Sequence, residues 1–120
     1  MRKVIYIAGP MSGMLEGNEA AFKEAERALT SAGYTVLNPR CLPVGMQAER
    51  YMPICLAMVQ QSDMVALLPG WEKSRGAQIE KGLALYQGIP VWPIERLCPD
   101  WDWLARMARQ IAQGNGPAGD

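Results

Sequence analysis

The sequence predicts an α/β fold in which helices cover both faces of a parallel sheet. Four short apolar runs, at residues 3–8, 34–37, 63–68 and 89–94, are expected to form the strands. Segments with apolar residues at helical spacing separate these runs, and glycine and proline punctuate the boundaries. Strands that alternate with helices of this length form right-handed βαβ units. We therefore predict a Rossmann-like or flavodoxin-like three-layer sandwich with four, or five, parallel strands.

The first half of the chain contains two predicted strands and one helix. The run KVIYIA (residues 3–8) is expected to be a buried strand that ends at Gly9. Residues 13–17 are expected to be a loop, and Asn18 to cap a helix that runs to Ala32 and ends at Gly33. The second strand, YTVL, is stopped by Asn38 and the proline that follows it.

The second half repeats this alternation after an irregular segment at residues 40–49. Helices are predicted at residues 50–61, with Pro53 in the first turn, and at residues 74–87. Pro90 and Pro93 weaken the fourth strand for a central place in the sheet. A last helix is expected at residues 101–113. The prediction is thus one domain at residues 1–113 with a flexible tail at residues 114–120.

Composition excludes several functional classes. The 120 residues carry 12 Lys+Arg and 12 Asp+Glu, so no basic face is available for a polymeric nucleic acid. Histidine is absent, which removes histidine triads and most catalytic zinc sites. We expect neither a metal nor a cofactor, and a small-molecule ligand instead.

The cysteines and the hydropathy pattern indicate the compartment. Cys41, Cys55 and Cys98 form no CxxC pair and are odd in number, which is typical of free thiols in a reducing environment. No apolar run approaches the ~20 residues that span a bilayer, and the N-terminal stretch lacks the pattern of a signal peptide. The expected location is the cytoplasm, with no membrane contact.

The carboxyl ends of the first three strands predict the position of a ligand site, because open parallel sheets bind ligands there. Both the glycine-rich turn after the first strand and the start of the helix at residue 74 are suited to an anion. The alternatives are a plain tight turn for the first and a simple helix cap for the second. The expected binding residues are Gly9, Pro10, Met11, Ser12, Gly13, Asn38, Pro69, Gly70, Trp71, Ser74 and Gly76. A phosphate would be held by dipoles and hydroxyls, with Arg40 or Arg75 as a cationic partner.

Glu80 is the residue that points most directly to chemistry. It falls on the helix face that Ile79 and Leu83 are expected to direct toward the sheet. The helix dipole would favour its ionised form, and an oriented carboxylate near the crevice is a candidate nucleophile or general base. The alternative is a structural carboxylate. Tyr6, near the end of the first strand, either directs its hydroxyl to the crevice or is a core tyrosine.

Other polar and aromatic residues are expected to have structural roles. Asp63 begins the third strand, at the edge away from the crevice, where a turn or cap role is expected. Cys55 has no activating partner in the sequence. Trp101 and Trp103 are expected to pack in the core. Trp71 is expected either to form one side of a ligand site or to lie in a subunit interface.

Six segments together resemble the nucleoside 2-deoxyribosyltransferase-like superfamily. The resemblance covers residues 4–91, and its most specific part is PGWEKSRGAQIE at residues 69–80. The matching segments are YIAGPMSG (residues 6–13), Asn18 with Phe22, NP (38–39), SD (62–63), LLPGWEKSRGAQIEKGLA (67–84) and GIPV (88–91).

The resemblance implies N-glycosidic chemistry on a nucleoside or nucleotide. It implies that Glu80 attacks the anomeric carbon of a deoxyribose, with Tyr6 orienting it, and that water or a second base resolves the covalent intermediate. It also implies that Gly9, Ser12, Gly13 and Ser74 hold a 5′-phosphate, and that a homo-oligomer completes each site from a neighbouring subunit.

One position departs from this pattern. Cys55 stands where many relatives carry an aspartate that helps the leaving base, and a thiol is a poorer general acid. A second hypothesis is therefore a non-catalytic nucleotide-binding module that keeps the phosphate cradle.

Overall fold

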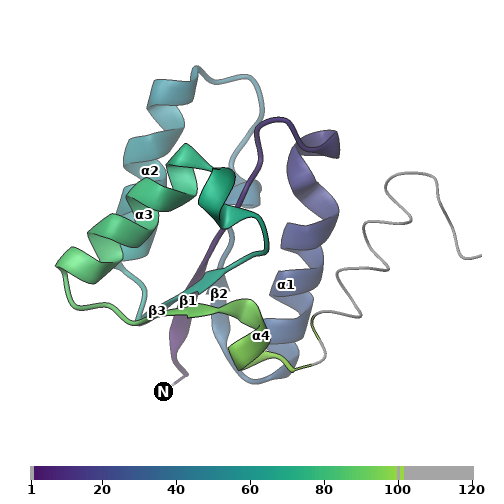
Figure 1. Cartoon of the computed structure of the whole chain (residues 1–120), viewed down its shortest axis with the longest axis vertical. Coiled ribbons are helices and arrows are strands. Elements are labelled where there is room, and N and C mark those ends of the chain that lie inside the picture. Colours follow the sequence, from purple (N-terminus) through teal and green to yellow (C-terminus); the bar gives the residue numbers. More distant parts are fainter. Residues whose placement is uncertain (1, 100, 102–120) are drawn as a thin grey trace, which may run out of the picture.

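The four predicted strands form, and helices separate them along the chain. The computed structural model shown in Figure 1 describes residues 2–99 and 101. Its strands and α-helices are β1 (Val4–Ala8), α1 (Glu19–Ser31), β2 (Thr35–Leu37), α2 (Ala48–Gln60), β3 (Met64–Leu67), α3 (Arg75–Tyr86), β4 (Val91–Pro93) and α4 (Ile94–Leu97). Short 3-10 turns are η1 (Leu15–Asn18), η2 (Pro39–Cys41) and η3 (Trp71–Lys73). Within the part of the chain described, no helix has the length and apolarity needed to cross a membrane.

The strands form one sheet in the order β2-β1-β3-β4, and every neighbouring pair is parallel. This confirms the predicted α/β fold with four parallel strands; residues 2–99 and 101 contain no fifth. β4 lies at the edge, where Pro90 and Pro93 remove no central ladder bond. β1 lies between β2 and β3, so the loops after these three strands meet at one end of the sheet.

Side chains of β1 alternate between two cores. Ile5 and Ile7 pack with α1, α4 and Trp101 on one face, whereas Tyr6 and Ala8 pack with α2 and α3 on the other. Figure 1 shows α1 on one side of the sheet and α2 with α3 on the opposite side. The three-layer arrangement follows from this alternation, because both faces of a central parallel strand must be covered.

Asn18 precedes α1 but does not cap it with its side chain, contrary to the sequence prediction. Its backbone is left-handed (φ 65°), and its Nδ2 donates to the carbonyl oxygen of Pro10 at 3.0 Å. The expected loop at residues 13–17 also includes the start of η1. The physical reason is that Asn18 is buried against the turn after β1 and satisfies that turn instead of the helix. Gly33, with φ 100°, ends α1 as predicted.

Helix α2 begins two residues earlier than predicted, so Pro53 lies beyond its first turn. Pro53 cannot donate to the carbonyl of Glu49. Glu49 is exposed, so water can satisfy its carbonyl on the outer side of the helix. The fourth strand is also shorter than predicted, because Ile94 begins α4.

The remaining structural expectations concern Asp63 and the residues from Trp101 onward. Asp63 lies at the amino end of β3, where its Oδ2 accepts from the Val4 backbone N–H at 2.8 Å, in the expected structural role. Trp101 is fully buried in the core, as predicted. The rest of the predicted last helix (residues 102–113, with Trp103) and the tail (residues 114–120) lie outside the described residues.

Candidate functional site

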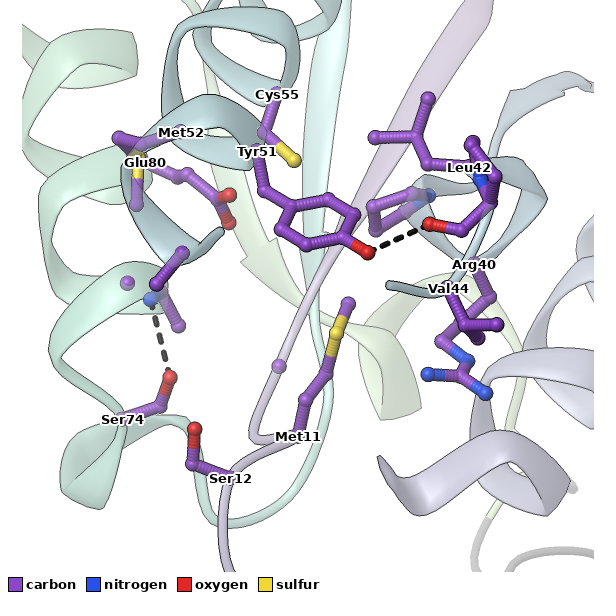
Figure 2. Close-up of a pocket in the computed structure, with 16 residues that line it drawn as sticks. Met11, Ser12, Arg40, Leu42, Val44, Tyr51, Met52, Cys55, Ser74 and Glu80 are labelled. Atoms are coloured by element: carbon purple, nitrogen blue, oxygen red, sulfur yellow. Dashed lines mark hydrogen bonds between the residues drawn. The ribbon is translucent and has the colours of Figure 1, made fainter. Parts of the chain in front are cut away.

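A cavity of about 350 Å³ opens at the carboxyl ends of β1 and β2 and beside the start of α3. This volume lies in the range of small-molecule sites. Its polar lining includes Ser12, Arg40, Tyr51, Ser74 and Glu80 (Figure 2). The three loops expected to meet here thus do so, and the first half of α2 adds a wall that the sequence did not predict.

Glu80 lies on the buried face of α3 and faces this cavity. Its neighbours on that face are Ala77 and Ala84, one turn away on either side, whereas Ile79 is exposed. The small alanines let α3 approach the sheet closely, and the Glu80 side chain is only 7% exposed. The prediction of an inward Glu80 is confirmed, although Ile79 does not define the inward face.

Tyr6 of β1 contacts Glu80 from the sheet side of α3. The Tyr6 hydroxyl donates to Glu80 Oε2 at 2.8 Å, and both residues are buried. Burial and the neighbouring Glu80 charge raise the pKa of the phenol, so Tyr6 stays a neutral donor. Tyr6 is thus a core tyrosine that does not itself line the cavity, and its hydroxyl reaches the cavity wall only through Glu80.

Burial also governs the charge of Glu80. It raises the pKa of this carboxyl from 4.5 to about 7, although hydrogen bonds from Tyr6 and Cys55 lower it. The net direction is thus opposite to the one that the helix dipole alone would give, because desolvation of the carboxylate is the largest effect. A carboxyl that titrates near neutral pH can act as an acid, a base or a nucleophile.

Cys55 of α2 completes a cluster with Glu80 and Tyr6. It lines the cavity at 7% exposure, and its thiol lies close enough to Tyr6 and Glu80 for both to affect its pKa. Burial raises the pKa of the thiol, so Cys55 is a neutral donor at pH 7. The sequence showed no partner for Cys55 because α2 and α3 meet only in the fold.

Two serines and two glycines gather at the start of α3. Ser74 caps the helix, its Oγ accepting from the Ala77 N–H at 3.1 Å, so the simple cap reading holds. Ser12 lies at the same end of the cavity in Figure 2. Gly9 and Gly76 also line it; Gly9 is required for packing, since a Cβ there would come within 2.7 Å of Cβ of the core residue Leu68. Small residues and first-turn N–H groups together leave room for an anion.

Met11 also lines the cavity as predicted, but several expected binding residues lie elsewhere. Asn38 is a structural residue: its Oδ1 accepts from the Arg40 N–H, and its Nδ2 donates to Glu26 Oε1 at 2.9 Å. Trp71 packs against the core with Lys81 Nζ 4.3 Å from its ring centroid. Pro10, Gly13, Pro69 and Gly70 form the turns behind the cavity, and none of the four lines it. Turn residues shape the loops, but their short side chains do not reach the ligand space.

The wall that sequence reasoning missed comes from residues 39–52. It comprises Pro39, Arg40, Leu42, Pro43, Val44, Ala48, Tyr51 and Met52, of which Arg40 was considered only as a phosphate partner. Tyr51 holds this irregular segment in place, since its hydroxyl donates to the Pro43 carbonyl at 2.6 Å and accepts from the Met46 N–H. No periodic pattern marks such a loop; the one signal available was Tyr51, an aromatic residue in the first turn of α2, which was not among the predicted site residues.

The described residues hold no cluster of three His, Cys, Asp or Glu side chains that would bind a metal ion. What the cavity offers is a tethered carboxyl, three hydroxyls, a guanidinium and an apolar wall. This set suits a polar ligand with one flat, apolar part.

Comparison with known proteins places the chain in a family. No curated protein matches it. The family described as a domain of unknown function, DUF4406, matches residues 3–92, which include β1, β2, β3, the first two residues of β4 and every residue that lines the cavity. Because this match covers well over half of its length, the chain belongs to the DUF4406 family.

Proposed function

We propose that this protein cleaves or transfers the N-glycosidic bond of a 2′-deoxynucleoside 5′-monophosphate, or of the nucleoside, with Glu80 as nucleophile. The observation that carries the proposal is the buried Glu80 carboxyl, which faces the cavity while Tyr6 holds its Oε2 at 2.8 Å. A fixed, desolvated carboxylate next to an open ligand space is what covalent glycosyl chemistry requires. The resemblance to the nucleoside 2-deoxyribosyltransferase-like superfamily at residues 69–80 supports the same role for Glu80.

The reaction is written in two displacement steps. Glu80 Oε1 attacks the anomeric carbon C1′; a C1′–O bond forms, and the bond from C1′ to the base nitrogen breaks. The electron pair leaves with the base, which takes a proton from solvent or from a neighbouring donor. Water, or the nitrogen of a second base, then attacks C1′ and gives up a proton to solvent, while the electron pair of the C1′–O bond returns to Glu80. With water, the products are the free base and 2-deoxyribose 5-phosphate.

The phosphate is proposed to lie at the start of α3, against Ser12 and Ser74. Six residues separate Ser74 from Glu80, a rise of roughly 9 Å along a helix. That separation leaves room for a deoxyribose between a phosphate at the helix start and the carboxylate. First-turn N–H groups and the positive end of the helix dipole favour an anion there, which fits a chain of zero net charge.

The setting is proposed to be the cytoplasm, and the active form a homo-oligomer whose neighbouring subunit completes the site. Free Cys41, Cys55 and Cys98 support a reducing compartment. Ile54 of α2 and Ile79 of α3 are exposed on adjoining helices, which supports a subunit contact beside the cavity. Light scattering tests the assembly, and a monomer at assay concentration would reject the shared site.

A mass-spectrometric screen of purified protein against deoxynucleotides, ribonucleotides and their nucleosides tests the proposed reaction. Release of a free base together with deoxyribose 5-phosphate is the expected result, at a rate proportional to protein concentration. A deoxyribosyl adduct on the peptide that contains Glu80, trapped by acid quench, would identify the intermediate. Absence of base release from every substrate, in a preparation that binds nucleotides, would reject the catalytic proposal.

Tyr6→Phe is expected to lower base release about tenfold and to move the midpoint of its pH profile upward from about 7. The Tyr6 hydrogen bond lowers the pKa of Glu80, so its loss raises that pKa further and leaves less carboxylate at neutral pH. Rates measured from pH 5 to pH 9 give the midpoint. Tyr34→Phe, in the core on the other face of the sheet, is the control. An unchanged midpoint in Tyr6→Phe would contradict the positioning role of Tyr6.

A second candidate function is a nucleotide-binding module that does not turn its ligand over. The observation that favours it is the neutral Cys55 thiol beside Glu80, at the position where many proteins of the resembled superfamily carry an aspartate. Without a carboxylic acid there, the leaving base has poorer help.

Cys55→Asp separates the two candidates. It is expected to raise base release by about 10²-fold, the lower end of what a positioned general acid contributes. The rate is measured from pH 5 to pH 9, because replacing Cys55 removes a hydrogen bond that lowers the pKa of Glu80. Cys55→Asn, similar in size to Asp but without an acidic proton, is the control. Equal rates in the two variants would mean that Cys55 does not limit turnover.

A further inference from the structure

Arg40 lies across the cavity from the phosphate end. The strand order β2-β1-β3 places Arg40, which follows β2, and Ser74, which follows β3, on opposite sides of the turn after β1. Figure 2 shows the Arg40 guanidinium on the far side of Tyr51 and Met11 from Glu80 and the two serines. A nucleotide with its phosphate at Ser74 and its sugar at Glu80 therefore extends its base toward Arg40.

The turn at residues 16–18, which contacts the Arg40 side chain, has a left-handed backbone. Glu16, Gly17 and Asn18 are three successive left-handed residues, with φ of 49°, 64° and 65°. Two of them are not glycine, and such residues adopt this backbone conformation only where the surrounding structure holds them in it. A Cβ on Gly17 would come within 2.7 Å of Arg40 Nη1, so the turn leaves space for the guanidinium.

The protein satisfies this guanidinium only in part. Nη2 has two distant partners, the Glu16 carbonyl at 3.4 Å and the exposed Glu19 carboxylate at 3.6 Å. Nε is buried and has no acceptor among the residues that the structure describes. A guanidinium presents donors only, so whatever completes its bonding must supply acceptor atoms.

The surface next to Arg40 is apolar. Leu42, Val44 and Met11 line the cavity there, and Val44 is 86% exposed, so a ligand would cover it. An apolar wall with donors at one end matches a flat ring whose edge carries an acceptor. Glu19, which is exposed outside this wall, carries the opposing charge that makes a second bound anion beside Arg40 less favourable.

We propose that Arg40 is a specificity residue that selects bases with an oxo group over bases with an amino group. Hypoxanthine and uracil present a carbonyl acceptor at ring position 6 or 4, where adenine and cytosine present an N–H donor. A donor facing the guanidinium would leave both groups unpaired, whereas an oxo group accepts from it. This inference depends on the proposed function, because it assumes a nucleotide oriented by Ser74 and Glu80.

The test compares two ligand pairs, dIMP with dAMP and dUMP with dCMP, which differ at this exocyclic group and in the proton on the adjacent ring nitrogen. Binding is measured by calorimetry in the Glu80→Gln background, so that no ligand is consumed. We expect the oxo ligand of each pair to bind about tenfold to a hundredfold more tightly. Adding Arg40→Met should bring both ratios close to one. Adding Arg50→Met, an exposed arginine outside the cavity, should leave them unchanged.

Each outcome has a separate meaning. Ratios that persist in Arg40→Met, or that favour the amino ligands from the start, overturn the inference and leave the proposed reaction standing. If Arg40→Met weakens all four nucleotides equally and leaves deoxyinosine and deoxyuridine unaffected, Arg40 binds the phosphate, and the inference is wrong. If no nucleotide binds and none is cleaved, the proposed function itself fails. Ratios taken within one variant do not depend on its folded fraction, so a less stable Arg40→Met still gives an answer.

Discussion

Glu80→Gln is expected to reduce base release by at least about 10³-fold while nucleotide binding remains. Glutamine keeps the shape of the side chain and can still accept from the Tyr6 hydroxyl, but its amide has no nucleophilic carboxylate oxygen. The loss should therefore fall on kcat, with little change in the dissociation constant. Single-turnover measurements by mass spectrometry, with calorimetry on the same preparation, separate the two quantities.

Glu72→Gln is the matched control for this change. Glu72 lies in η3, eight residues before Glu80, and is exposed outside the cavity. Its variant should retain the wild-type rate. If Glu80→Gln kept more than about a tenth of that rate, Glu80 would be a structural carboxylate, the alternative that the sequence left open.

The same substitution is expected to stabilise the fold at alkaline pH. The pKa of Glu80 is raised from 4.5 in the unfolded chain to about 7 in the folded one. Between these values the folded state binds more protons than the unfolded state, so the free energy of unfolding falls as pH rises. The contribution of Glu80 is present below about pH 4.5 and is lost once pH has risen through about 7. The total is about 3 kcal/mol.

Glu80→Gln removes this titration because an amide is neutral at every pH. The free-energy advantage of the variant over the wild type should be about 2–3 kcal/mol larger at pH 8 than at pH 5. Urea unfolding at these two pH values measures it, with Glu72→Gln as the exposed control. An advantage that does not change between pH 5 and pH 8 would mean that Glu80 ionises in the folded protein as it does in water.

Both predictions arise from one conflict in the fold. The face of α3 that packs on the sheet carries Ala77, Glu80 and Ala84, so the helix cannot bury its alanines without burying the carboxyl. Tyr6 and Cys55 offset part of the desolvation, and the rest remains as a raised pKa. A stability deficit at a polar cavity is the usual mark of a residue kept for its chemistry.

Local patterns predicted the fold well because they report short-range physics. Apolar β-branched runs and helical spacing identified all four strands and helices α1, α2 and α3. Pro90 and Pro93 predicted an edge strand, and β4 is one, because a proline has no N–H for a second neighbour. Errors fell at the ends of elements. Asn18 is of a residue type preferred at a helix cap, yet its side chain donates to the carbonyl of Pro10 in the turn after β1.

The site was predicted only where a single strand or helix positions it. In a parallel sheet, ligands bind beyond the carboxyl ends of the strands, so the order of elements along the chain predicts which residues lie there. Four residues predicted in this way line the cavity: Gly9, Ser12, Ser74 and Glu80. Asn38 and Trp71 also follow the carboxyl ends of strands, but the Asn38 side chain hydrogen-bonds to Glu26 and the Trp71 side chain packs on the core. The position of a residue along the chain does not specify the direction of its side chain.

Three features were predictable from local patterns: the α/β class, the edge of the sheet that carries the ligand space, and a carboxylate that faces it. Each of them follows from spacing within one element or from strand order. What surrounds that carboxylate depends instead on how the elements pack. Cys55 approaches Glu80 because α2 packs on α3, and Arg40 faces the cavity because the left-handed turn at residues 16–18 makes room for it. Such contacts join segments far apart along the chain, and they depend on packing distances that no local pattern encodes.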